Sequence, residues 1–314
     1  MKKRIAILGA TSHIAKGLID NFCKDGEVKL NLFARSPDKI RDFLKSINCP
    51  KVCNISSFGK FAKGNYDVVI NCVGIGNPAL LKDTGAAIFE LTETYDNLIF
   101  SYLKNHKESI YINFSSGAVY GREFNSPVNY SSVNSVNVNA LDETSYYSIA
   151  KLHSEAKHRA SLGFKIIDLR IFAYFSRFID LDSHYLITGM INSIMSGKVF
   201  KTGKNNIIRD YVGPEDLYSL VCSCIKKGSN DAYDVYTRMP VKKFDILKSF
   251  HKEFGLKYKI SDRYSSTSVT GPKEVYWSKN RKAKELGFKP AYSSLKLLIK
   301  ETKAILGKVP GLKG

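Results

Sequence analysis

The chain has 314 residues, of which 44% are hydrophobic and 25% are charged, a composition typical of a folded globular protein and not of a disordered one. Lysine and arginine outnumber aspartate and glutamate by 48 to 29, so the formal net charge is +19. This charge favours small anionic ligands, but the lysines are scattered and no stretch interleaves arginine with aromatic residues, so we expect no nucleic-acid partner.

The first twenty residues do not predict a signal peptide. Basic residues precede an apolar run, but this run is only about six residues long and is followed by Ser12, His13 and Lys16. No later run approaches the roughly 18 apolar residues that a membrane span needs. We therefore expect a cytoplasmic protein with no membrane partner.

The cysteines do not predict a metal site. The six residues are Cys23, Cys49, Cys53, Cys72, Cys222 and Cys224. Neither close pair, 49/53 or 222/224, matches a zinc template with nearby histidines. In a reducing compartment we expect all six to be small hydrophobic thiols, some of them buried.

The first half of the chain alternates buried strands with helices. We expect strands at residues 4–9, 28–35, 66–74, 109–116 and 164–172, with helices up to about residue 23, over 36–47, over about 84–105 and around Tyr147 and Lys151. Such alternation predicts an α/β fold with a doubly wound parallel sheet of the Rossmann type.

After Phe172 the alternation weakens into helices near 185–196 and 214–226, short strands and a lysine-rich helical C-terminus. We therefore expect residues 1–172 to form a dinucleotide-binding Rossmann domain. Residues 173–314 should form mainly a smaller, discontinuous substrate-binding lobe, with some segments returning to the Rossmann core. The loop over 121–145 is long enough to be a functional flap near a ligand.

A short glycine-containing loop, "GATSHIAKG", follows the first strand and opens a helix. A dinucleotide's pyrophosphate binds at this place, against backbone N–H groups and the positive end of the helix. Gly9 suits the tight turn. Ser12 and Ala15 stand where a G-x-x-G-x-x-G loop has glycines, so the match is incomplete, and a plain strand-to-helix turn is the alternative.

Arg35 and Ser36 end the second strand. An acidic residue here would bind a ribose 2′-hydroxyl, whereas an arginine would meet a 2′-phosphate. Because no aspartate or glutamate occupies this position, NADP(H) is favoured over NAD(H). The alternative is that Arg35 is a solvated surface charge.

A serine pair and a Tyr-x-x-x-Lys spacing come next. Ser116 ends a strand at the sheet edge where such folds bind ligands, and it could donate a hydrogen bond to a substrate oxygen. Tyr147 and Lys151 lie four residues apart, on one face of a helix, so an ammonium could lower the pKa of a phenol. The alternatives are a serine that bonds turn backbone and a tyrosine that covers a lysine stem.

Taken in order, these motifs resemble those of the extended short-chain dehydrogenases/reductases, the NAD-dependent epimerase/dehydratase family of nucleotide-sugar enzymes. The resemblance runs from "AILGATSHIA" through "SSGAVYG" and "YSIAK" to "RDYVGPEDL". It covers most of the chain.

The resemblance implies a role for several residues. Tyr147 would be the general acid/base, Lys151 would favour its phenolate and hold the nicotinamide ribose, and Ser116 would bind the carbonyl or alcohol oxygen. Arg209, in a stretch similar to the family's R-D-[YF]-V motif, would contact the substrate's diphosphate. His184 would be a further substrate-binding residue.

The sequence also departs from the family. Gly117 and Ala118 stand where the 4,6-dehydratases have an Asp-Glu pair, so we expect no dehydration. The reductive epimerases that make GDP-fucose have a cysteine at the position of Ala118 and a histidine like His184, and only the histidine is present. In the stretch that corresponds to the family's R-x-F-N-x-Y-G-P motif, Ala173 replaces the asparagine and Ser176-Arg177 replaces Gly-Pro. We therefore do not carry over the family's nucleotide-sugar contacts at these positions.

The resulting hypothesis is a reductase that uses NADP(H), or NAD(H), on a nucleotide-diphosphate-linked 4-keto sugar in polysaccharide precursor synthesis, and that forms a homodimer. The alternatives are a 4-epimerase with tightly bound NAD and a non-catalytic Rossmann protein that senses redox state or binds RNA. The expected cofactor-binding residues are Gly9, Thr11, Ser12, His13, Ile14, Arg35, Ser36, Cys72, Val73, Gly74, Tyr147 and Lys151.

Overall fold

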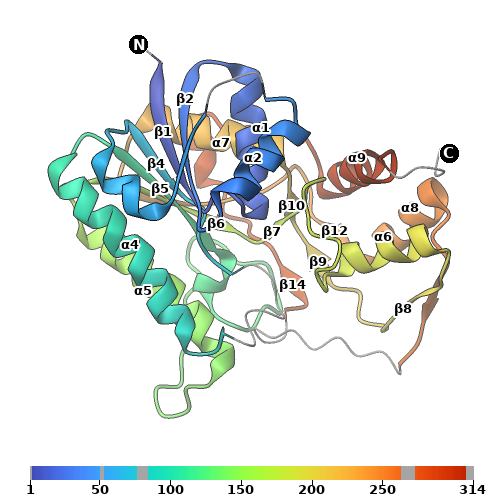
Figure 1. The fold of residues 1–314 in the computed structure, drawn as a ribbon. Helices are drawn as coiled ribbons and strands as arrows, with labels where there is room; N and C mark the ends of the chain where they lie inside the picture. The colour runs from blue at the N-terminus through green and yellow to red at the C-terminus, as the bar shows by residue number, and fades with distance from the viewer. Residues whose placement is uncertain (1, 50–52, 76–83, 263–272, 309–314) are drawn as a thin grey trace.

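The structure is a computed structural model that describes residues 2–49, 53–75, 84–262 and 273–308. Seven strands form one parallel sheet in the order β11-β6-β5-β4-β1-β2-β3 (Figure 1). The strands are β1 (Lys3–Leu8), β2 (Val28–Phe33), β3 (Asn54–Ser56), β4 (Val68–Asn71), β5 (Ile110–Ser116), β6 (Lys165–Ile171) and β11 (Asp231–Asp234). The predicted doubly wound α/β fold is confirmed, and the strand order reverses between β1 and β4, where such sheets bind ligands.

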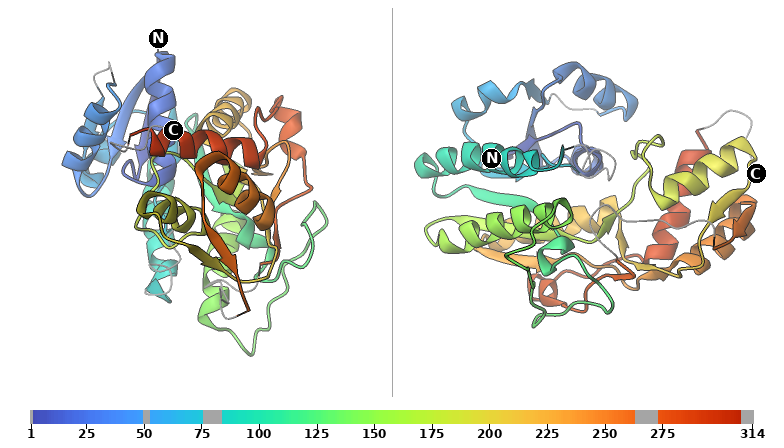
Figure 2. Two further views of the ribbon diagram at one scale, coloured as in Figure 1. Left: turned by 90° about the vertical axis from the view of Figure 1, so that its right-hand side faces the viewer. Right: turned by 90° about the horizontal axis from the view of Figure 1, so that it is seen from below.

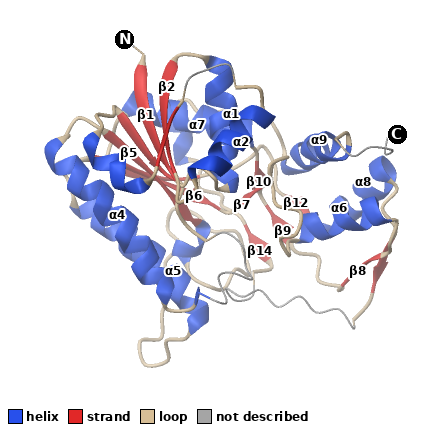
Figure 3. Cartoon of the chain, in the orientation of Figure 1, coloured by secondary structure: helices blue, strands red, loops and turns tan. Residues whose placement is uncertain are grey.

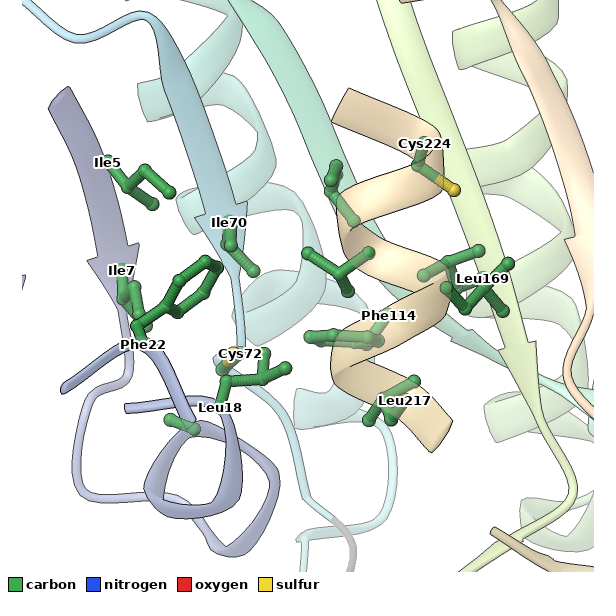
Figure 4. Packing of buried hydrophobic residues seen from close by; sticks show 14 of the residues in the cluster. Ile5, Ile7, Leu18, Phe22, Ile70, Cys72, Phe114, Leu169, Leu217 and Cys224 are labelled. Atoms are coloured by element: carbon green, nitrogen blue, oxygen red, sulfur yellow. The ribbon is translucent and has the colours of Figure 1, made fainter. Parts of the chain in front are cut away.

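Successive side chains of a strand point to opposite faces of the sheet, and in this sheet both sets are apolar. Helices cover both faces, so both are buried. In β1, Ile5 and Ile7 join one hydrophobic cluster, and Ala6 and Leu8 join another. The first cluster includes side chains from α1 (His13–Asp25), α2 (Pro37–Ser46) and α7 (Pro214–Lys227), and the second includes side chains from α4 (Ala87–Asn105). Figure 4 shows Leu18 and Leu217 of the first cluster against the sheet.

A second lobe packs at one side of the sheet and its helices, as Figure 2 shows. Its elements are β7 (Ala173–Tyr174), α6 (Leu186–Ser196), β8 (Phe200–Thr202), β9 (Ile208–Arg209), β10 (Tyr211–Val212), β12 (Val241–Lys242), α8 (Lys243–Phe254), β13 (Tyr258–Ile260), β14 (Val275–Tyr276) and α9 (Ser294–Leu306). It has its own core, in which Met190, Phe250 and Leu298 are fully buried. The segment 173–314 also returns to the large sheet, because β11 pairs with β6 and α7, labelled in Figure 3, packs in the first hydrophobic cluster.

Three short 3-10 helices complete the secondary structure of the described residues, namely η1 (Phe58–Lys63), η2 (Gly117–Tyr120) and η3 (Lys282–Leu286). Asp142 caps the N-terminus of the helix α5 (Glu143–Ala160), and its side chain accepts a hydrogen bond from the backbone N–H of Thr144. The loop between η2 and α5 is held at Asn134, which donates to the carbonyl oxygen of Val119 at 3.0 Å. No helix in the described ranges is apolar over the length needed to cross a bilayer.

The prediction that all six cysteines are thiols is wrong for two of them. Cys23, near the end of α1, forms a disulfide with Cys49, which follows α2, and their Cα atoms lie 5.6 Å apart. The sulfur of Cys53 lies within 4.8 Å of both. This pairing depends on how close the ends of α1 and α2 come in space. Cys72 and Cys224 are buried hydrophobic thiols, as expected.

Candidate active site

Gly9 sits in the turn between β1 and α1, directly against the end of β4. Its φ of +73° lies in the left-handed region that glycine favours, and a Cβ atom here would lie 2.8 Å from the backbone carbonyl carbon of Cys72. The expected loops around Gly9 and around Cys72–Gly74 are therefore adjacent at the point where the strand order reverses. Any other residue at position 9 would push the two loops apart.

The start of α1 is built to present backbone N–H groups. Ser12 is the N-cap, and its hydroxyl accepts a hydrogen bond from the N–H of Ala15 at 3.3 Å. Ala15 is fully buried, and the next glycine of the loop is Gly17, where a Cβ would lie 2.0 Å from the hydroxyl oxygen of Tyr174. The third glycine of the G-x-x-G-x-x-G pattern is thus found two residues later, at position 17, where it allows close packing against Tyr174. The chain around Gly9 and Ser12 fits a dinucleotide pyrophosphate.

His13 is not directed at an open cofactor site in this structure. Its Nε2 lies 2.8 Å from the hydroxyl oxygen of Ser176, and its ring packs edge-on against Tyr174 at 4.7 Å between ring centres. Burial lowers the pKa of His13 to about 4, so the imidazole is neutral near pH 7. The side chain ties the start of α1 to the beginning of the second lobe.

The remaining residues expected at the cofactor lie at the same sheet edge. The backbone N–H of Ala10 donates to the carbonyl oxygen of Phe33, which ends β2, so Arg35 and Ser36 follow a strand end that touches the Gly9 turn. Both side chains are exposed, and Arg35 makes no ion pair with a residue in the described ranges. Thr11, Ile14 and Val73 are partly buried at this edge, and Gly74 is exposed.

Ser116 ends β5 and caps η2. Its Oγ accepts a hydrogen bond from the backbone N–H of Ala118 at 3.2 Å and lies 3.1 Å from the Oη of Tyr276. Gly117 has no room for a side chain, because a Cβ there would lie 2.4 Å from a ring carbon of Phe172. Ala118 is buried. Neither position next to Ser116 can therefore carry the carboxylates that dehydration needs.

Tyr147 and Lys151 lie on the same face of α5, as the spacing predicts. The Nζ of Lys151 is 5.9 Å from the centre of the Tyr147 ring. The same ammonium donates to the carbonyl oxygen of Phe114 at 3.2 Å, two residues before Ser116, and Lys151 is buried. The structure therefore anchors the tyrosine helix to the serine strand through Lys151.

A buried ion pair behind Lys151 supports this arrangement. Glu155, one helical turn further along α5, accepts from the hydroxyl of Ser115 at 2.5 Å and pairs with Arg170 of β6 at 2.6 Å. Ser148 donates to the carbonyl oxygen of Ala118 at 2.7 Å. These bonds join α5 to β5, β6 and η2. They therefore fix the helix of Tyr147 and Lys151 against the strand of Ser116.

The first two residues of the R-D-Y-V motif lie in different places, Arg209 near the candidate site and Asp210 in the protein interior. Arg209, on β9, places its guanidinium carbon 5.8 Å from the centre of the Tyr276 ring, and burial lowers the pKa of this guanidinium. Asp210 points inward and accepts hydrogen bonds from the N–H of Thr237 at 3.1 Å and the hydroxyl of Ser294 at 2.9 Å. Arg209 thus reaches the neighbourhood of Ser116, with Tyr276 between them.

Lys273 is a second cation at this point, and the sequence analysis missed it. Its Nζ lies 4.5 Å from the centre of the Tyr276 ring. Burial, with a smaller contribution from the charge of Arg209, lowers the pKa of Lys273 to about 7. Neither Lys273 nor Arg209 pairs with a carboxylate of the described residues. Two like charges held near one ring, with no carboxylate partner among the described residues, would favour an anion there.

Tyr185, the neighbour of His184, lies near the candidate tyrosine Tyr147. His184 is exposed just before α6. Burial, together with the nearby Tyr147 phenol, raises the pKa of Tyr185, and the same two causes act on Tyr276, whose pKa also rises. Sequence reasoning missed both of these tyrosines. Tyr276 lies on β14, which has only two residues and exists through its pairing with β9, and Tyr185 is the N-cap of α6 with no motif around it.

The comparisons with known proteins give the family and the fold of the chain. A family profile described as the NAD dependent epimerase/dehydratase family matches residues 5–237. The chain belongs to this family, and it is an enzyme of the extended short-chain dehydrogenase/reductase type, as the sequence motifs predicted. No curated protein matches the chain in sequence.

Several solved structures have the same fold. A UDP-N-acetylglucosamine 4-epimerase from Methanobrevibacter ruminantium superimposes with a TM-score of 0.81 at 17% identity, over 98% of this chain and 100% of that one. A UDP-glucose 4-epimerase from Thermotoga maritima gives 0.78 at 16% identity, over 96% and 97%. A dTDP-glucose 4,6-dehydratase from Bacillus anthracis, in complex with NAD, gives 0.76 at 14% identity, over 96% of each chain. At these identities the likeness concerns the fold.

Proposed function

We propose that the protein reduces a nucleotide-diphosphate-linked 4-keto sugar with NADP(H), and that Tyr147 is the general acid. The observation that carries this proposal is the meeting of three features at one sheet edge. Tyr147 and Lys151 lie beside the strand end of Ser116, and the cations Arg209 and Lys273 lie at the ring of Tyr276, whose hydroxyl is next to Ser116. A phenol, a hydroxyl donor and an anion site are the groups that carbonyl reduction on an NDP-sugar needs.

Each residue then has a defined task. Ser116 donates a hydrogen bond to the carbonyl oxygen of the sugar, and Tyr147 transfers its proton to that oxygen as the carbon is reduced. Lys151 favours the phenolate that Tyr147 leaves behind, and the diphosphate lies against Arg209 and Lys273. The nicotinamide would supply the hydride when the dinucleotide is bound, with the pyrophosphate held at the N-terminus of α1 beside the Gly9 turn.

The surroundings of Ser116 support reduction over dehydration. Removing water from the sugar requires an acid and a base in addition to the tyrosine. The ring of Phe172 excludes a side chain at position 117, and Ala118 is apolar and buried. The solved structures of 4-epimerases share the fold, so epimerisation with tightly bound NAD is the competing outcome of the test below.

The choice of NADP(H) rests on Arg35. Its exposed guanidinium follows the end of β2 next to the Gly9 turn, where the ribose of a dinucleotide lies in this fold. A homodimer and a cytoplasmic location stay predictions.

The test is to incubate the protein with UDP- and dTDP-linked 4-keto-6-deoxyhexoses in deuterated water, with NADPH or NADH, and to analyse the sugar by mass spectrometry and NMR. We expect one hydride at C4, faster turnover with NADPH than with NADH, and no enzyme-dependent deuterium at C3 or C5. Faster turnover with NADH would contradict the cofactor assignment. Deuterium incorporation that His184→Asn abolishes would favour a reductive epimerase. Interconversion of UDP-glucose and UDP-galactose without added cofactor would favour a 4-epimerase.

A further inference from the structure

Tyr276 reaches the catalytic serine from a distant part of the sequence. It lies on β14, and its ring packs edge-on against Phe124 at 4.7 Å and at a tilt against Phe172 at 5.0 Å between ring centres. Only 6% of the residue is exposed. Its Oη is 3.1 Å from the Oγ of Ser116, 160 residues away in sequence. The second lobe therefore contributes a hydroxyl to the catalytic edge of the Rossmann sheet.

The hydrogen-bonding capacity of Ser116 is limited. A hydroxyl has one proton to donate and two lone pairs that accept. The backbone N–H of Ala118 occupies one lone pair of Ser116. If Tyr276 donates to the other, the Ser116 proton can point only toward the substrate side.

The surroundings of Tyr276 favour this direction of the bond. Burial raises the pKa of Tyr276, so the phenol keeps its proton at neutral pH. The rings of Phe124 and Phe172 beside it offer no strong acceptor for that proton, whereas the Ser116 oxygen lies at hydrogen-bond distance. A buried hydroxyl that is left without an acceptor would be costly, so the proton belongs on the bond to Ser116.

We propose that Tyr276 is a positioning residue that holds Ser116 as a hydrogen-bond donor toward the carbonyl oxygen of the substrate. The inference rests on the proposed reduction. A carbonyl oxygen only accepts hydrogen bonds, whereas a sugar hydroxyl both donates and accepts. A serine that can only donate therefore matches the keto form of the sugar better than a serine that is free to rotate.

The test is a double-mutant cycle of Tyr276→Phe and Ser116→Ala, read as turnover of the 4-keto-6-deoxyhexose substrate with NADPH. Tyr276→Phe keeps the ring packing and removes only the hydroxyl. We expect this variant to lower kcat about tenfold, the effect of one lost hydrogen bond, with a smaller change in KM. In the Ser116→Ala background the same change should lower kcat by less than twofold, because Tyr276 acts through the serine.

Tyr120→Phe is the matched control. Tyr120 belongs to the same aromatic group, but its hydroxyl bonds to Asp234 at 3.0 Å and not to Ser116. Its effect should be the same in both backgrounds. An equal loss from Tyr276→Phe with and without the Ser116 hydroxyl would overturn the proposal, as would a change in KM alone.

The same cycle measured by urea unfolding separates this proposal from the proposed function. Coupling between the two side chains in unfolding is expected from the hydrogen bond, whatever the substrate is. Absence of this coupling would overturn the bond itself. If the wild-type protein reduces no 4-keto sugar while the coupling is present, the proposed function fails, and the assigned role of the bond in reduction fails with it.

Discussion

At the scale of single residues, we expect one of two adjacent tyrosines to transfer the proton. Tyr147 lies with Lys151 on one face of α5, and Tyr146, about 100° away around the helix, packs against Phe89 at 5.6 Å between ring centres. Tyr147→Phe keeps the ring and removes the transferable proton. We expect turnover with NADPH to fall by about 100-fold or more, with cofactor affinity largely retained.

Tyr146→Phe is the control for this change, since it removes a hydroxyl from the same helical turn on another face. It should remain active. Near-normal turnover by Tyr147→Phe, with cofactor binding intact, would show that another group delivers the proton.

At the scale of elements, a buried polar network joins α4, α5, β5 and β6. His158 of α5 is fully buried between two carboxylates, with its Nδ1 2.9 Å from Asp168 and its Nε2 2.8 Å from Asp96. Asn113 donates to Asp168 at 2.7 Å, and Tyr111 donates to Asp96 at 3.0 Å. The helix that carries Tyr147 and Lys151 is thus bonded through His158 to the neighbouring helix and strands.

The charge of His158 should make stability depend on pH. Burial alone would lower its pKa, but the charges of Asp168 and Asp96 and the bonds to them raise it to about 9, above the value of roughly 6.5 in an unfolded chain. The imidazolium therefore stabilises the fold fully below about pH 6.5, and this contribution is lost as the pH rises toward 9.

We expect the difference in unfolding free energy between wild type and His158→Gln to be largest near pH 6 and to shrink by pH 9. Urea unfolding at constant ionic strength measures it, and taking the difference cancels the titration of other groups. His153→Gln, on the exposed part of the same helix, should stay within about 0.5 kcal/mol of wild type. A His158→Gln penalty that is the same at pH 6 and pH 9 would mean that the buried imidazole is neutral.

At the scale of the whole molecule, the elements predicted from the sequence are those with a local signal. β1, β4, β5 and β6 carry runs of apolar residues, and their alternation with helices was enough to predict the doubly wound sheet. The strand β11, with the sequence DAYD, has no such run, and its pairing with β6 defines it.

Some residues of the candidate site could likewise be predicted from local motifs, and others could not. Ser116, Tyr147 and Lys151 follow from motifs within one segment each. Tyr276 and Lys273 reach the site only because β14 pairs with β9 in the second lobe, and no local spacing indicates this. The disulfide between Cys23 and Cys49 was missed for the same physical reason, since it depends on a contact between two helix ends.

Binding of the substrate should draw on both lobes, because the second lobe supplies the cations. Lys273, on the segment that reaches back to Ser116, has its pKa lowered to about 7 by burial and by the charge of Arg209. Tyr276, against which it packs, and Tyr211 keep their protons at neutral pH, since burial raises the pKa of both. Lys273 is therefore the cation of this group that loses its charge near neutrality, while Arg209 stays charged.

We expect the affinity for UDP-glucose, measured by calorimetry at constant ionic strength, to fall as the pH rises from 6 to 8. The diphosphate of an NDP-sugar stays fully ionised in this range, so the change reflects protonation of the protein. The affinity should fall and not rise, because an anion binds the protonated ammonium and Lys273 loses its proton above about pH 7. One such proton changes the affinity by at most about tenfold per pH unit. Lys273→Met should bind more weakly at pH 6 and lose most of this slope, whereas Lys279→Met, at an exposed position of the same segment, should retain it. A slope that survives in Lys273→Met would assign the titration to another group and leave Arg209 as the cation that binds the diphosphate.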